Sequence, residues 1–250
     1  MQIKFIQTLI DKIRGKNLSN ISIKKLQNNF DKKIKKLKNK NKIKVAFLHM
    51  YATDIQNLTI FDAMLQDDYF EPFFIVNPDV SRSKENFDYQ YKRSLEELRK
   101  KYGNNKVLEG YNYVTNSYID YTKEFDIATT NNPYDLMSHK FFKISYWAKK
   151  NIPMFYISYF YMGRCHVSID NLKMPQFSYL WKFFAENDYV LELAKKYEIL
   201  KGNNIVVTGS PKMDKLATIN IDSNNRNNIL KIVYLLLLLD IFYVEFVIVY

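Results

Sequence analysis

Short apolar runs alternate with amphipathic segments along residues 42–209, and this alternation leaves few folds open to the chain. The amphipathic segments have the 3.6-residue spacing of helices, whereas the apolar runs are continuous and bounded by Asn, Pro, Gly or Asp. Such runs are typical of strands buried on both faces, which helices must then cover. We therefore predict an α/β fold with a parallel sheet and helices on both of its faces. The predicted strands are residues 42–50, 72–79, 125–135, 152–162, 180–187 and 204–209.

Four helices are predicted between these strands. The last is expected over residues 189–200, where Asp188 would cap the start and Gly202 would close the end. Apolar residues at helical spacing define the other three, which carry Leu58, Phe61 and Leu65, then Phe87, Tyr91, Leu95 and Leu98, then Phe141, Ile144 and Ala148.

The positive charge of the chain is concentrated at its N-terminus. Residues 1–44 hold fourteen of the 37 Lys and Arg residues and two of the 26 acidic residues. The rest of the chain, with 23 basic and 24 acidic residues, is almost neutral. We therefore predict a basic helical arm over residues 1–41 that precedes the α/β body.

The arm has an apolar stripe whose partner the sequence leaves open. Two interpretations remain, since the stripe can pack on the body or lie on an anionic membrane surface. Nucleic acid is not expected as a partner, because the arm lacks interleaved aromatic residues and the body has no basic surplus. The stripe consists of Ile23, Leu26, Phe30, Ile34 and Leu37.

Ligands of parallel α/β sheets bind beyond the carboxyl ends of the strands. This rule nominates four loops as parts of a binding site. The Asn-Asn-Pro turn within the second loop can equally be purely structural. The four loops are residues 49–54, 131–135, 160–166 and 209–214.

Two histidines are candidates for proton transfer. His49 ends the first predicted strand, and His166 lies in a predicted strand-end loop beside Cys165. A metal site is not expected, because the histidines and the single cysteine lack the spacing of metal ligands. A cofactor is not expected either, because the chain has neither a glycine-rich dinucleotide fingerprint nor a phosphate-binding loop of the Walker type.

Several segments resemble the CDP-glycerol glycerophosphotransferase-like family, whose enzymes act in teichoic-acid and capsular-polysaccharide assembly. The resemblance rests on "KVAFLHM", "FDIATTNNPYD", the tyrosine-rich strand at 154–161 and, above all, "NNIVVTGSPKMDKL". It covers about residues 43–220. It implies the N-terminal, Rossmann-like half of a GT-B architecture over residues 42–220, which would bind the acceptor. The acceptor-side cleft residues would be Tyr51, Asp54, Asn132, Pro133, Tyr134, Asp135, Gly163, Gly209, Pro211, Lys212 and Asp214.

The chain departs from the family pattern in two places. Met162 stands where many members carry a histidine before Gly163, which puts an acid–base role there in doubt. The donor-binding domain would begin just after Leu216, but the thirty-four residues that follow cannot form a second Rossmann domain. We expect residues 221–250 to be a hydrophobic tail produced by a frameshift. A membrane helix over 229–250 is the alternative, although Lys231, Asp240 and Glu245 would make its insertion costly.

By resemblance, the complete enzyme would transfer glycerol phosphate or a related group from a CDP-activated donor to a polysaccharide or lipid-linked acceptor. This chain would be its acceptor-side part and would use the donor only if a second domain is supplied. Two alternatives are a GT-B glycosyltransferase fragment for capsule or lipooligosaccharide synthesis and a non-catalytic binding module. We expect a cytoplasmic protein held at the inner face of the membrane by residues 1–41, since no secretory signal is evident.

Overall fold

The computed structural model describes residues 20–52, 55–159 and 166–213. The chain divides into two compact units, residues 1–210 and 211–250, and all the helices and strands named below belong to the first. Predictions about residues 1–19 of the arm, Asp54, Met162, Gly163, Asp214 and the tail 221–250 lie outside the described residues.

Seven parallel strands form one sheet, in the order β3-β2-β1-β6-β7-β8-β9. A short antiparallel hairpin of β4, Tyr111–Asn112, and β5, Ser117–Tyr118, follows β3. The seven strands of the sheet are β1 Ile43–His49, β2 Phe70–Val76, β3 Val107–Glu109, β6 Ile127–Thr130, β7 Met154–Ile157, β8 Lys182–Ala185 and β9 Ile205–Val207.

Helices cover both faces of this sheet, and each face has its own apolar core. The core that contains Phe47 of β1 is closed by Phe61 of α3 and Tyr91 of α4. The opposite core is closed by Trp147 of α5 and Leu172 of α6, together with residues of α2 and α7. The prediction of an α/β Rossmann-like fold is thus confirmed. The α-helices are α2 Asn20–Leu37, α3 Ile55–Leu65, α4 Lys84–Tyr102, α5 Ile144–Lys149, α6 His166–Lys173 and α7 Asp188–Tyr197. Four 3₁₀ turns complete the chain, η1 Asn104–Lys106, η2 Asp135–Met137, η3 Lys140–Phe142 and η4 Pro175–Tyr179.

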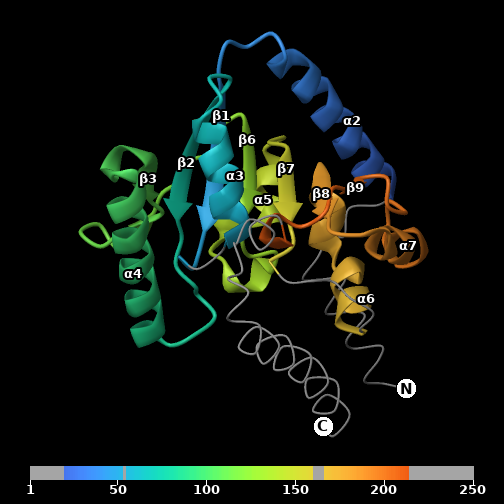
Figure 1. Ribbon diagram of the computed structural model, residues 1–250. Helices are drawn as coiled ribbons and strands as arrows, with labels where there is room; N and C mark the ends of the chain where they lie inside the picture. The colour runs from blue at the N-terminus through green and yellow to red at the C-terminus, as the bar shows by residue number, and fades with distance from the viewer. Residues whose placement is uncertain (1–19, 53–54, 160–165, 214–250) are drawn as a thin grey trace, which may run out of the picture. The chain divides into compact units, whose positions relative to one another are not determined.

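The strand order reverses between β1 and β6, which are neighbours in the sheet although β2 to β5 separate them in sequence. From this pair the order runs outward through β2 and β3 on one side and through β7, β8 and β9 on the other (Figure 1). At such a reversal the loops that follow the two central strands diverge, which opens a crevice at the carboxyl edge of the sheet. In this fold the segments after His49 and Thr130 come together at this part of the carboxyl edge.

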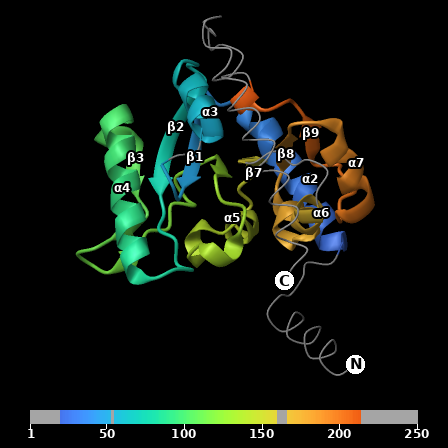
Figure 2. The same ribbon diagram turned by 60° about the horizontal axis from the view of Figure 1, so that its bottom comes forward.

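Helix α2 uses its apolar stripe within the domain. Both views show it beside α7 and the β8–β9 end of the sheet (Figures 1 and 2). Ile23 and Phe30 are buried in the core, and the amide of Gln27 donates hydrogen bonds to the carbonyls of Ser178 and Leu180 at 3.2 and 2.8 Å. Of the two interpretations of the stripe, packing on the body is confirmed, because these residues are already covered.

Three local predictions were wrong. The helix expected around residues 141–148 is divided into η3 and α5, because the carboxylate of Asp135 accepts hydrogen bonds from the backbone N–H of Ile144 and Ser145 and so begins a new helix there. Both ends of α7 differ from the prediction: Asn187, rather than Asp188, caps its start, since its Oδ1 accepts from the N–H of Val190 at 3.1 Å, and the helix ends at Tyr197 with Glu198, rather than Gly202, as its C-cap. His166 is the first residue of α6 and not part of a loop.

Candidate functional site

The loops after β1 and β6 are fastened together at the crevice by one side chain. Asn131 Oδ1 accepts a hydrogen bond from Met50 N–H at 3.0 Å, and Asn131 Nδ2 donates to the carbonyl of Tyr51 at 3.2 Å. A buried amide that satisfies two backbone groups fixes both loops relative to each other. Tyr51, a predicted cleft residue, therefore has a defined position at the carboxyl edge.

A buried carboxylate after β2 orients two further groups at this edge. The Asp79 side chain is fully buried, and its Oδ2 accepts from the Tyr51 hydroxyl at 2.5 Å and lies 3.2 Å from Arg82 Nε. Its Oδ1 accepts from the N–H and the hydroxyl of Ser81 at 2.8 and 2.6 Å. Burial, together with the hydrogen bond to Asp79, raises the pKa of Tyr51, so its phenol stays protonated and acts as a donor.

Two arginines line a cavity of about 310 Å³ beside this cluster. Arg82 comes from the loop before α4, and Arg93 lies on α4 itself. Arg93 is held by an ion pair between its Nε and Glu97 Oε1 at 2.6 Å. The two guanidinium groups and the amide of Gln90 give the cavity several hydrogen-bond donors, which suits an anionic ligand rich in oxygen. The lining residues are Tyr51, Ala52, Arg82, Gln90 and Arg93.

The predicted cleft residues after β6 have mainly structural contacts. Asn132 Oδ1 accepts from the N–H of Tyr134 at 3.1 Å, which shapes the turn at the buried Pro133. The carboxylate of Asp135 accepts a hydrogen bond from the first residue of α5, and burial raises the pKa of this carboxyl. Tyr134 differs, because its hydroxyl lies 3.1 Å from that of Tyr159 beyond β7 and forms an exposed polar pair at the carboxyl edge.

His49 points into the core rather than into the crevice. It is fully buried, its ring centroid lies 5.1 Å from that of Phe74, and burial lowers its pKa to about 3. A contact with the backbone of Tyr51 acts in the opposite direction on this pKa but is the smaller effect. His49 is thus a neutral core residue in this conformation, and proton transfer to a ligand would require it to become accessible.

Gly209 is not among the residues that line the cavity at Arg82 and Arg93. His166 begins α6, and its side chain lies outside that part. Gly209 has a positive φ of 86°, which favours glycine, and open space where a Cβ would lie. Pro211 and Lys212 belong to the second compact unit.

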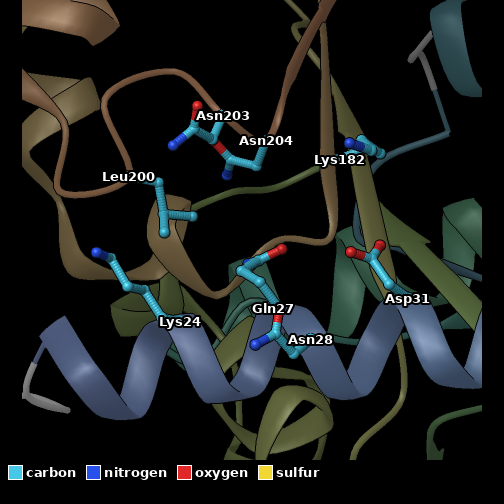
Figure 3. Close-up of a pocket in the computed structure, with 8 residues that line it drawn as sticks. All are labelled: Lys24, Gln27, Asn28, Asp31, Lys182, Leu200, Asn203 and Asn204. Carbon is cyan, nitrogen blue, oxygen red and sulfur yellow. The ribbon is translucent and has the colours of Figure 1, made fainter.

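A second cavity of about 310 Å³ lies at the opposite edge of the sheet, where β8 and β9 begin. Figure 3 shows the residues of α2 on one side of it and those of the turn before β9 on the other. Asn204 anchors this turn, since its Nδ2 donates to the carbonyl of Phe177 at 3.0 Å. This cavity therefore lies at the interface between α2 and the rest of the domain. Its lining residues are Lys24, Gln27, Asn28, Asp31, Lys182, Leu200, Asn203 and Asn204.

The sequence analysis missed Asp79, Arg82, Gln90 and Arg93. The rule that nominated four strand-end loops applies equally to the loop after β2, where Asp79 and Arg82 lie, but that loop was not chosen. Gln90 and Arg93 gave no signal of their own, because polar residues on a surface helix are common.

Comparison with family models, curated proteins and solved structures found no match to this chain. Within residues 20–52, 55–159 and 166–213, no group of three His, Cys, Asp or Glu side chains is placed to hold a metal ion. In the same residues, no helix combines the length and the apolar character needed to cross a membrane. The fold and the site together define a Rossmann-like α/β domain with a donor-rich cavity at its carboxyl edge.

Proposed function

We propose that this domain is the acceptor-side half of a glycerophosphotransferase-like enzyme. The complete enzyme would move glycerol phosphate, or a related group, from a CDP-activated donor to a cell-surface polysaccharide or a lipid-linked acceptor. The observation that carries the proposal is the cavity at the carboxyl edge, between the loops that follow β1 and β2 and helix α4. Ligands of this fold class bind outside the carboxyl ends of the strands.

The chemistry of the cavity supports an acceptor with hydroxyl and phosphate groups. Arg82 and Arg93 supply positive charge, while Tyr51 and Gln90 supply polar groups that suit hydroxyls. These residues would bind and orient the acceptor, which contributes to rate by holding its hydroxyl in position. A base for that hydroxyl and charge stabilisation for the leaving nucleotide would come from the donor side of the complete enzyme.

The exposed face of α2 supports a location at an anionic membrane surface. Lys25, Lys32 and Lys36 are exposed and recur at spacings of seven and four, so they lie along one side of the helix. Each lysine near an anionic lipid surface contributes about 1 kcal/mol of binding free energy. The apolar stripe is used by the core, so this association would be electrostatic and sensitive to salt.

Equilibrium binding with the full chain tests the proposed function. We expect a glycerol phosphate oligomer to bind saturably, and CDP-glycerol to bind at least about a hundredfold more weakly, because donor contacts belong to the other half. Micromolar affinity for CDP-glycerol, or the absence of oligomer binding, would contradict the proposal. Binding of a neutral sugar oligomer in preference to the phosphate oligomer would favour a sugar transferase instead.

A further inference from the structure

We propose that the cavity between Arg82 and Arg93 is a subsite for the phosphate ester of a polyol phosphate. This inference rests on the proposed function and adds the group that is recognised and the residues that recognise it. A phosphate monoester or diester that carries a short polyol is the ligand class that we assign to the cavity.

The first argument is the way in which the two guanidinium groups are held. Asp79 binds Arg82 at Nε, and Glu97 binds Arg93 at Nε. An arginine has five N–H donors, and four of them belong to the two terminal nitrogens. A carboxylate at Nε therefore restrains each guanidinium and leaves terminal donors for a second anion. Paired donors of this kind match phosphate oxygens in geometry as well as in charge.

The second argument is that Arg82 is positioned by a buried group. The Asp79 side chain is fully buried, whereas the Arg82 side chain is 57% exposed, so the carboxylate lies inside the protein and the cation lies at the surface. Asp79 receives two further hydrogen bonds from Ser81 and one from Tyr51, which hold it in place. A ligand would thus meet an arginine whose position is already set, which lowers the entropy lost on binding.

The third argument is the composition and size of the cavity. Gln90 and Arg93 are three residues apart on α4 and therefore lie on one face of the helix, opposite Tyr51 and Ala52 of the β1 loop. The volume of about 310 Å³ is at the small end of ligand sites and suits a phosphate with a few attached carbons. The arginines suit the phosphate, and the phenol oxygen and the amide beside them suit hydroxyl groups. The cavity therefore provides for both parts of a polyol phosphate.

Isothermal titration calorimetry on the full chain tests this subsite with sn-glycerol 3-phosphate, glycerol and CDP as probes. We expect saturable binding of glycerol phosphate and weaker binding of glycerol and CDP. The variants Arg82→Gln and Arg93→Gln should each weaken glycerol phosphate binding by about tenfold or more, because each removes a charge-assisted contact. The matched control is Lys92→Gln, which removes an exposed positive charge from α4 at a residue whose Nζ lies over the ring of Tyr113, outside the cavity.

The control separates recognition from general charge attraction. If Lys92→Gln weakens binding as much as Arg82→Gln, or if glycerol phosphate does not bind saturably, the subsite is wrong. Tighter binding of CDP than of glycerol phosphate would assign the arginines to the donor and would also overturn it. Tyr51→Phe tests the cavity with a smaller change in packing, because it removes the hydroxyl and keeps the aromatic ring. We expect it to weaken binding while the thermal unfolding curve stays cooperative.

The outcomes also separate this inference from the proposed function. An oligomer that binds the wild-type chain and both arginine variants equally well would leave the acceptor-side role standing and remove the subsite. Arginine-dependent binding of glycerol phosphate without any binding of the oligomer would keep the subsite and remove the acceptor-side role.

Discussion

The hydroxyl of Tyr51 donates a hydrogen bond of 2.5 Å to Oδ2 of Asp79 and so joins the loop after β1 to the loop after β2. Tyr51 lines the cavity, whereas the Asp79 side chain is fully buried behind it. The carboxylate of Asp79 therefore positions both the phenol of Tyr51 and the guanidinium of Arg82, which belong to different strand-end loops.

Substitution of Asp79 should destabilise the protein. Asp79→Asn replaces a buried charged acceptor that has four partners, and we expect a loss of about 2–3 kcal/mol in the free energy of unfolding. Urea denaturation of the variant measures this loss. The matched control, Asp68→Asn, changes an exposed aspartate and should shift the free energy by less than about 0.5 kcal/mol. Equal effects of the two substitutions would show that Asp79 does not organise these loops.

His49 should make the stability of the protein depend on pH. Its folded-state pKa of about 3 lies below the ordinary value of 6.5, so the unfolded chain binds the proton more tightly. The stabilisation is fully present above pH 6.5 and is lost as the pH falls from there towards about 3. Between pH 7 and pH 5 the loss is about 2 kcal/mol.

The variant His49→Gln isolates this contribution from the buried carboxyls of Asp135 and Glu198, whose pKa values are raised by burial. Urea denaturation at both pH values should show a fall in the wild-type free energy of unfolding that exceeds the fall in the variant by about 2 kcal/mol. Parallel pH profiles would mean that His49 is accessible to water in the native state.

The docking of α2 depends on an amide that bonds to two carbonyls. Gln27→Leu leaves the carbonyls of Ser178 and Leu180 without this donor, and we expect a loss of about 1–3 kcal/mol in the free energy of unfolding. The neighbouring exposed position provides the control, since Asn28→Gln should change the free energy by less than about 0.5 kcal/mol. A Gln27→Leu protein as stable as the wild type would show that apolar packing alone holds the helix.

The lysines of α2 can be tested without deleting the helix, whose apolar residues belong to the core. The triple variant Lys25→Gln, Lys32→Gln, Lys36→Gln should bind vesicles of phosphatidylglycerol and phosphatidylcholine roughly a hundredfold more weakly than the wild type, at about 1 kcal/mol per lysine. Vesicle co-sedimentation at low salt measures the change. Unaltered binding would remove α2 as the membrane contact, and circular dichroism checks that the helix is retained.

The alternation of apolar runs with helical periodicity was sufficient to predict the six main strands and the class of fold. This succeeded because burial on both faces of a parallel sheet imposes a local composition on each strand. The three-residue β3 and the hairpin of β4 and β5 were not predicted, since strands of two or three residues carry too little periodicity to be recognised. The start of α5 also escaped prediction, because it depends on a hydrogen bond from the N–H of Ile144 to the carboxylate of Asp135, nine positions earlier in the chain.

The candidate site was predicted only in part, because several of its groups come from segments far apart in the sequence. The carboxyl-edge rule located Tyr51 and Tyr134, but it did not show that Asp79 would hold Tyr51 or that Arg93 of α4 would face the same cavity. These groups are far apart in sequence, and strand order and helix packing bring them together.

The sequence by itself determined six of the seven strands of the sheet, most of the helices but not α6, and the basic character of the N-terminal segment, because propensity and hydrophobic pattern act over a few residues. The tertiary structure alone decided that the stripe of α2 faces the core, that His49 is neutral and buried, and that Arg82 and Arg93 share one cavity. Burial and long-range contact are properties of the assembled sheet, and no local pattern encodes them.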